Sequence, residues 1–376
     1  MLRQKSLSKC IGGILTVIML IYPTVVSGQQ AVDNNDTTDK DFLQKEHLKI
    51  LDIGNSYTQD ATALLPLVVD ASGADMSDVC LWTITRSGGS FKSWYDCYED
   101  RDFLEEYYLV RNVGTLPVNL SGAKGEKGDG SLFRKALTDV QWDLIVIHPL
   151  STAAPYYNRW TGGDEYGCLD KLLEIIRRHQ PSARIGFYII HSTWDYYTTN
   201  EEHSSLARWQ LNANSVMSLE DEGEIDLIIP YGTAIENLRS SSLNNEYDLT
   251  RDGLHCGFGL AQYTAACCYY QAVFAPRTGK SVLGNMARTD CSDMESVYPI
   301  VPVDDDNAII AQKAAILATR NPYQCLNPET TPHYVVMKRP RSVVPQDIYK
   351  LSGIKVNINQ RLNGIYIHDG RKVTKR

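Results

Sequence analysis

The chain has 376 residues, of which 43% are hydrophobic and 22% are charged, as in an ordinary globular protein. This composition excludes wholesale disorder, a collagen-like repeat and a coiled coil. The 37 Lys and Arg residues against 45 Asp and Glu residues give a formal charge of -8. No broad cationic field is therefore available to gather nucleic acid. The length suits one large domain with an appendage, or two domains.

The N-terminus is typical of a secretory signal peptide over residues 1–28. Three basic residues precede an apolar run over residues 11–26, and small residues follow at a cleavage position. An uncleaved anchor helix is the alternative, but Pro23 interrupts the run and a polar, flexible leader over residues 29–46 follows it. We therefore expect an exported protein that is periplasmic, on the cell surface or secreted, with no transmembrane segment after cleavage.

The cysteine count also suits an oxidising compartment. Without Cys10, which falls in the signal peptide, eight cysteines remain, and an even number favours disulfide pairing. We expect some disulfides, although the sequence does not fix their connectivity. The adjacent pair Cys267 and Cys268 lies in an apolar helical pattern and could instead be two buried thiols.

Strand and helix patterns alternate along most of the chain. Short apolar runs rich in β-branched residues predict strands over residues 48–53, 79–85, 143–147, 184–190 and 225–230. Helical periodicity between and after them predicts helices over residues 61–69, 169–179, 204–219 and 260–274. Such alternation favours a parallel sheet covered on both faces, that is, a doubly wound, flavodoxin-like α/β/α fold.

The predicted main domain spans residues 47–325. Residues 112–130 are rich in glycine and are interpreted as an inserted surface loop. After Pro276 the alternation stops, and the extension to residue 325 contains one Ala-rich helical pattern over residues 307–319 that we expect to pack back on the domain. Residues 326–376 are basic and interrupted by proline, which predicts a small β-rich tail.

Two short segments carry candidate chemistry. Ser56 follows the first predicted strand in the turn sequence Gly54-Asn55-Ser56, where it could present a hydroxyl or simply cap the next helix. Far downstream, the spacing of Asp252 and His255 lets a carboxylate orient an imidazole that could take a proton from a serine. Alternatively, Asp252 caps the following helix and His255 packs nearby.

Together these segments resemble the SGNH/GDSL hydrolase superfamily, which has a nucleophilic serine after its first strand and an Asp-x-x-His pair near the end of the domain. The resemblance implies a catalytic triad of Ser56, His255 and Asp252 and an acyl-enzyme intermediate. It requires no metal or organic cofactor, and the sequence contains no zinc, P-loop or dinucleotide fingerprint. The absence of a G-x-S-x-G motif argues against an α/β-hydrolase.

The resemblance also implies an oxyanion hole. The backbone N–H groups of Ser56 and Gly88 are its expected donors, with Gly89 in reserve for Gly88. Family members supply a third donor from an Asn or Gln after the third strand, but this chain has His148 there. A neutral imidazole can donate one N–H, so His148 is either the third donor, a structural histidine or a sign that activity has been lost.

Aromatic residues in the predicted loops suggest the substrate. Tyr157 and Trp160 follow the third strand and Trp194 follows the fourth, and flat amphipathic rings suit a sugar face. Asn55 and Gly89, beside the expected reaction centre, complete the predicted substrate-binding residues. With export and the carbohydrate esterases of the superfamily, this favours removal of acyl groups, above all acetyl, from a polysaccharide or oligosaccharide. Ordinary loop packing is the alternative, because the chain has 22 tyrosines.

Two further hypotheses stay open: a lipid esterase or thioesterase, and a catalytically inactive carbohydrate-binding protein on the same fold. His191, at the end of the fourth strand, is interpreted as structural. The tail around residues 364–373 resembles the C-terminal β-segment of exported Bacteroidetes proteins, and otherwise is a solvated basic terminus. The sequence carries no signal for oligomeric state.

Overall fold

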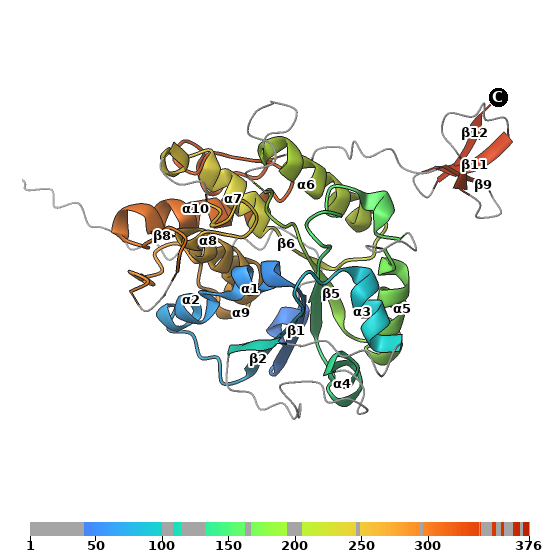
Figure 1. Ribbon diagram of the computed structural model, residues 1–376, viewed down its shortest axis with the longest axis horizontal. Coiled ribbons are helices and arrows are strands. Elements are labelled where there is room, and N and C mark those ends of the chain that lie inside the picture. The colour runs from blue at the N-terminus through green and yellow to red at the C-terminus, as the bar shows by residue number, and fades with distance from the viewer. Residues whose placement is uncertain are drawn as a thin grey trace, which may run out of the picture.

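A six-stranded sheet forms the centre of the computed structural model (Figure 1). The structure describes residues 41–99, 108–113, 132–161, 167–193, 205–245, 249–292, 296–337, 339, 348–350, 355–356, 364–368 and 371–375. The strands of the sheet are β1 (Leu48–Gly54), β2 (Val79–Thr85), β3 (Tyr108–Val113), β4 (Leu144–Ile147), β5 (Arg184–Tyr188) and β6 (Leu227–Ile229).

The strand order is β3-β2-β1-β4-β5-β6, and every neighbouring pair is parallel except β2 with β3. Leaving out β3, the order is that of a flavodoxin-like fold, so the predicted fold class is confirmed. The order reverses between β1 and β4. In open parallel sheets, ligands bind outside the carboxyl ends of the strands at such a switch point.

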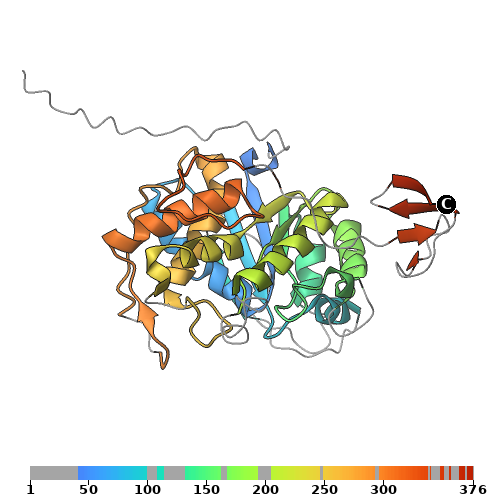
Figure 2. The same cartoon turned by 90° about the horizontal axis from the view of Figure 1, so that it is seen from above.

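Helices cover both faces of the sheet, and Figure 2 shows the layers from above. One face carries α1 (Ser56–Thr62), α2 (Leu65–Ala71), α7 (Tyr231–Arg239), α8 (Leu260–Tyr269) and α10 (Asp305–Arg320). The other face carries α3 (Phe91–Glu99), α4 (Leu132–Asp139), α5 (Leu169–His179) and α6 (Ser205–Asp221). The short α9 (Ala275–Thr278) follows a π-helical turn over Tyr270–Phe274 at the end of α8.

Alternating side chains of β1 supply both cores. Leu48 and Ile50 belong to the hydrophobic cluster on the α8 face, whereas Leu51 and Ile53 belong to the cluster on the α5 face. This is the two-residue period of a strand buried on both sides, which is why its sequence is a nearly continuous apolar run. Asp52 points the same way as Ile50 and is fully buried.

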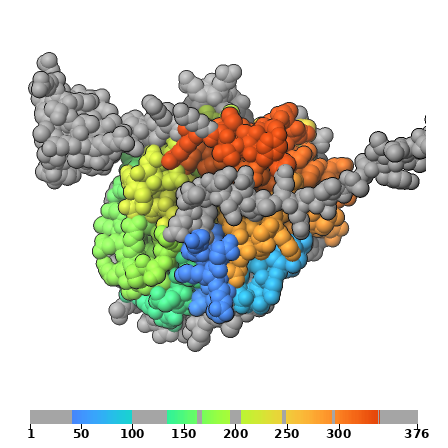
Figure 3. All heavy atoms as spheres, turned by 180° about the vertical axis from the view of Figure 1, so that it is seen from behind, coloured from blue at the N-terminus to red at the C-terminus, as the bar shows by residue number. Residues whose placement is uncertain are grey.

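The expected C-terminal extension does pack on the domain. The predicted helix is α10, which begins at a capping box in which the Asp304 side chain accepts from the backbone N–H groups of Asp306 and Asn307. Its buried alanines join the core on the α8 face. In the rear view of Figure 3, the orange-red surface of this region lies directly against the body of the domain.

Several predictions of local structure were incomplete. Residues 61–69 do not form one helix, because α1 ends at Thr62 and α2 begins at Leu65 with a proline in its first turn. The predicted loop over residues 112–130 overlaps the edge strand β3, and residues 114–130 lie outside the described part of the chain. The sequence also gave no sign of α7, whose residues are all buried, so that no amphipathic period appears.

The expected disulfides are absent from the part of the chain that the structure describes. None of the eight cysteines there is joined in a disulfide, and seven of them are buried, so that prediction was wrong. Among the same residues no helix is long and apolar enough to cross a membrane. The tail forms a separate antiparallel sheet of β9 (Ile348–Lys350), β10 (Lys355–Val356), β11 (Gly364–His368) and β12 (Arg371–Lys375), in the order β10-β9-β11-β12.

Candidate active site

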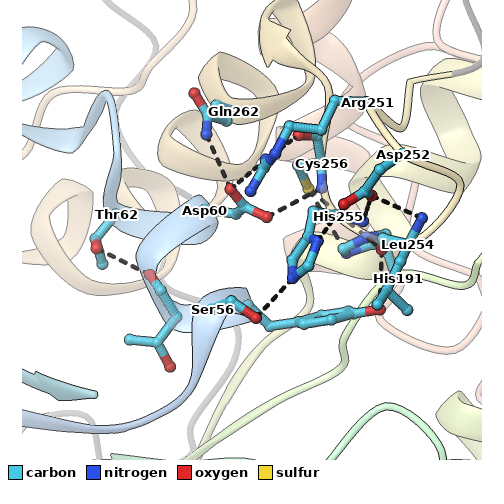
Figure 4. A network of polar contacts seen from close by, with 12 residues as sticks. Ser56, Asp60, Thr62, His191, Arg251, Asp252, Leu254, His255, Cys256 and Gln262 are labelled. Carbon is cyan, nitrogen blue, oxygen red and sulfur yellow. Dashed lines mark hydrogen bonds and ion pairs between the residues drawn. The ribbon is translucent and has the colours of Figure 1, made fainter. Parts of the chain in front are cut away.

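Three side chains from distant parts of the chain meet at the carboxyl edge of the sheet (Figure 4). Ser56 is the first residue of α1, directly after β1, and its Oγ lies 2.8 Å from Nε2 of His255. The other ring nitrogen, Nδ1 of His255, lies 2.7 Å from Oδ2 of Asp252. The structure thus joins the serine predicted from one motif to the pair predicted from the other.

Asp252 is held by the loop that it belongs to. Its Oδ1 accepts hydrogen bonds from the backbone N–H of Leu254 at 3.0 Å and of His255 at 2.7 Å. Burial alone would raise the pKa of Asp252, but the hydrogen bonds from His255 and Leu254 lower that pKa to about 2. The carboxyl group is therefore ionised at neutral pH and can fix the imidazole with a proton on Nδ1, leaving Nε2 free to accept from Ser56.

Asn55 determines how the chain enters α1. Its side-chain oxygen caps the helix by accepting from the Tyr57 N–H at 2.9 Å, and its amide donates to the Gly89 carbonyl at 2.9 Å. The side chain is 1% exposed. Its expected role as a substrate-binding residue is therefore not supported, because both polar atoms are used inside the protein. Asn55 instead ties the Ser56 turn to the glycine turn after β2.

Two backbone N–H groups at the site, one of them that of Ser56, are available to a ligand. In the described residues, neither the N–H of Ser56 nor that of Gly88 has a hydrogen-bond acceptor. Gly88 is exposed, has a φ of 62°, and has open space where a Cβ would be. Gly89 is buried and its N–H donates to the Arg86 carbonyl at 3.1 Å, so it serves neither as reserve donor nor as a substrate contact.

The geometry does not support His148 as a third oxyanion donor. Its Nδ1 lies 2.9 Å from the Pro149 carbonyl, which can only accept, so the ring proton is on Nδ1. Burial lowers the pKa of His148 to about 4, which keeps the ring neutral and leaves Nε2 as an acceptor. The hydroxyl of Thr58 lies 2.8 Å from that Nε2 and donates to it. Of the interpretations given above for His148, these contacts favour a structural histidine.

A buried carboxylate links α1 to the loop that carries His255. Asp60, one turn after Ser56, accepts from Nη1 of Arg251 at 2.7 Å and from the Cys256 N–H at 3.0 Å. It also accepts from Gln262 at the start of α8 at 2.9 Å, as Figure 4 shows. The sequence analysis missed this carboxylate, although its position four residues after Ser56 places both on one helix face.

Of the three aromatic residues expected to bind sugar, the structure describes Trp160 and Tyr157. Trp160 is 0% exposed; its indole N–H donates to the Ala153 carbonyl at 3.0 Å and its ring stacks on Phe187. It is a core residue, so its predicted contact with substrate was wrong. Tyr157 is half-buried and packs edge-on against Trp160. Trp194 lies outside the described residues.

Residues 49–295 match the family described as "Domain of unknown function (DUF4886)". The chain belongs to this family. The match contains all of β1 to β6 except Leu48, together with Ser56, Asp252 and His255. A search of curated proteins found no match.

Solved structures extend the comparison of this DUF4886 chain. A DUF4886 family protein from Bacteroides uniformis aligns with a TM-score of 0.56 and 23% identity, covering 75% of this chain and 98% of that one. That likeness shows a shared fold. A putative GDSL-like lipase from Parabacteroides merdae aligns with a TM-score of 0.36 and 14% identity, covering 61% of this chain and 97% of that one. Likeness of this degree says nothing about the activity of the DUF4886 chain.

Proposed function

We propose that the protein is a serine ester hydrolase with Ser56 as nucleophile, His255 as general base and Asp252 as the group that orients the base. One observation carries this proposal: the continuous hydrogen-bonded line from Asp252 through His255 to Ser56, with distances of 2.7 and 2.8 Å. Geometry of this kind is how a triad is recognised, whatever the order of its members in the chain. Partial exposure of His255 and Asp252, at 21% and 26% of their side chains, gives substrate access.

The proposed reaction follows from these positions. His255 takes the proton of Ser56 through Nε2 as Oγ attacks the ester carbonyl, and the negative charge passes to the carbonyl oxygen. The free N–H groups of Ser56 and Gly88 would hold that oxygen, which makes a hole of two backbone donors. The imidazolium then protonates the leaving alcohol as the acyl-enzyme forms. Water, deprotonated by the same base, releases the acid and restores Ser56.

As substrate we propose an acylated carbohydrate, with acetyl as the acyl group. Support comes from the sequence pattern of an exported protein in residues 1–28 and from the aromatic loop after β4. Tyr156 in that loop is 45% exposed, with the Arg159 guanidinium 6.0 Å from its ring centroid. An exposed, amphipathic aromatic ring can stack on the apolar face of a sugar ring.

The test is ester hydrolysis by protein lacking residues 1–28. We expect p-nitrophenyl acetate to be cleaved faster than longer-chain esters, and Ser56→Ala and His255→Ala each to lower kcat by about 10⁴-fold or more, as for other triads. Ser77→Ala, which removes an exposed hydroxyl elsewhere, is the matched control and should keep wild-type rates. Release of acetate from acetylated polysaccharides then tests the substrate class.

Other outcomes would identify the competing functions. A preference for long acyl chains or thioesters, still dependent on Ser56, would replace the carbohydrate substrate with a lipid or thioester. Binding of glycans without hydrolysis, equal in wild type and Ser56→Ala, would contradict the enzyme and indicate a carbohydrate-binding protein.

A further inference from the structure

One peptide unit connects the acid and the base of the proposed triad, Asp252 and His255. It joins Leu254 to His255, and its N–H donates to Oδ1 of Asp252 at 2.7 Å. Its carbonyl, that of Leu254, accepts two hydrogen bonds from outside the loop. Tyr57 Oη donates at 2.9 Å and His191 Nε2 donates at 2.9 Å. The orientation of this unit therefore fixes both the Asp252 carboxylate and the backbone from which His255 projects.

We infer that Tyr57 and His191 are positioning residues for the proposed reaction, acting through the Leu254 carbonyl. The inference rests on the proposed function and goes beyond it, because neither side chain belongs to the triad or to the oxyanion hole. Tyr57 follows Ser56 directly in the chain, so the same residue connects the nucleophile to the loop that carries the base.

Burial and stacking make the two donors rigid. Tyr57 is 2% exposed and His191 is 1% exposed, and their rings stack with centroids 4.5 Å apart and planes 19° apart. The loop that they hold is itself accessible, since Leu254 is 36% exposed. Without inner anchors, such a loop would have freedom to move its imidazole away from Ser56. A misplacement of about 1 Å at a reacting group can cost about 10²-fold in rate.

His191 is a neutral ring that donates a hydrogen bond through Nε2. Burial, and then the charge of Arg239, lower the pKa of His191 to about 3, so the ring is neutral at any ordinary assay pH. Its Nδ1 lies 3.6 Å from Sγ of Cys256. Burial raises the pKa of the Cys256 thiol well above its usual value, so the thiol keeps its proton and can donate to Nδ1. The ring proton then remains on Nε2, directed at Leu254.

Because two donors share one carbonyl, each can partly replace the other. We therefore expect Tyr57→Phe and His191→Phe, which keep the rings, each to lower kcat about three- to tenfold with KM unchanged. The double variant should lose more than the product of the two, about 10²- to 10³-fold, since the carbonyl then has no anchor.

Two further variants distinguish loss of the positioning hydrogen bonds from disruption of the fold. Tyr57→Phe/His191→Gln returns an N–H donor to the site and should recover most of the lost kcat. Tyr323→Phe removes a hydroxyl that donates to Glu220 at 2.8 Å, away from Ser56, and should leave kinetics unchanged. Urea unfolding of each variant shows whether the protein has folded.

The result that overturns the inference is a folded double variant with kcat and KM like wild type, while Ser56→Ala is inactive; the proposed function then stands alone. Hydrolysis that does not depend on Ser56 would overturn both. If the double variant does not fold, Tyr57→Phe alone decides: kcat lower by threefold or more with KM unchanged supports the inference, and wild-type kinetics contradict it.

Discussion

At the scale of single residues, three histidines close to Ser56 differ in the groups that their ring nitrogens contact. Burial lowers the pKa of His148 to about 4, and burial together with Arg239 lowers the pKa of His191 to about 3. Both rings are neutral and bonded to protein carbonyls, at Pro149 and Leu254. His255 is the one whose ring nitrogens face a carboxylate and a serine hydroxyl. In the proposed reaction, acid–base work therefore falls to His255.

The structural role of His148 can be tested through its partner. Thr58→Val keeps the side-chain shape but removes the hydroxyl that donates to Nε2 at 2.8 Å. A buried acceptor left unpaired costs about 1–3 kcal/mol, so we expect the free energy of unfolding in urea to fall by that amount. We expect kcat to stay within threefold of wild type. A loss of about 10²-fold in kcat without loss of stability would return His148 to the oxyanion hole.

Sequence alone predicted the three residues of the proposed triad, but not the contacts that hold them in place. Ser56, Asp252 and His255 carry reactive side chains at recognisable spacings, so they could be found without coordinates. The tautomer of His148 could not, because it depends on a carbonyl and a hydroxyl that only the fold brings to its two nitrogens. The role of the Leu254 carbonyl could not be predicted either, because every residue has a backbone carbonyl and the sequence does not single one out.

At the scale of elements, the junction of β1 with α1 leaves no room for a side chain at Gly54. A Cβ there would lie 2.0 Å from Oγ1 of Thr58 and 2.3 Å from Nε2 of His148. The strand therefore ends in a glycine so that the helix can start close to β4. Ser56 is placed by this contact, two residues further along the chain.

Gly54→Ala should accordingly displace Ser56 from His255 as well as destabilise the protein. We expect overpacking to cost about 1–3 kcal/mol of unfolding free energy, and the displaced start of α1 to lower kcat about 10²-fold. Gly223→Ala is the matched control: its φ of 76° costs about 1–2 kcal/mol in strain, but its Cβ meets nothing within 4 Å. If the two variants were equally stable and both kept the wild-type kcat, the conclusion that this junction places Ser56 would be contradicted.

The elements that the sequence predicted well share a physical property. β2 and α5 were predicted with the observed bounds, because one is a continuous apolar run and the other has a clear polar face. The edge strand β3 and the wholly buried α7 lack those signals. Burial of every residue of α7 removes the polar face from which a helix is inferred.

At the scale of the whole molecule, each face of the sheet has its own core, and both cores contain unpaired thiols. Cys267 and Cys268 lie in the core on the α8 face, and Cys80 lies in the core on the α5 face. Burial raises the pKa of Cys80 to about 12, so its thiol is protonated at neutral pH. These cysteines act as small apolar side chains, which explains why an even count did not indicate disulfides.

Asp52 is a buried carboxyl group on the α8 face of the sheet, and it should make stability depend on pH. Asp52 accepts from Tyr188 Oη at 2.8 Å and from Tyr269 Oη at 3.3 Å. Burial raises the pKa of Asp52 to about 7, and the two hydroxyl bonds only partly offset this. Because the folded state holds this proton more tightly than the unfolded chain, the stabilisation is complete below about pH 4 and is lost as pH rises towards 7.

Asp52→Asn cannot titrate, so comparison with wild type isolates this group. Between pH 4.5 and 6.5 we expect the unfolding free energy of wild type, relative to Asp52→Asn, to fall by up to about 1.4 kcal/mol per pH unit. The difference should become constant above about pH 8, once Asp52 has ionised in both states. Urea unfolding at several pH values gives both curves. Parallel curves would mean that Asp52 has the same pKa folded and unfolded, and that the two tyrosines stabilise the carboxylate as well as water does.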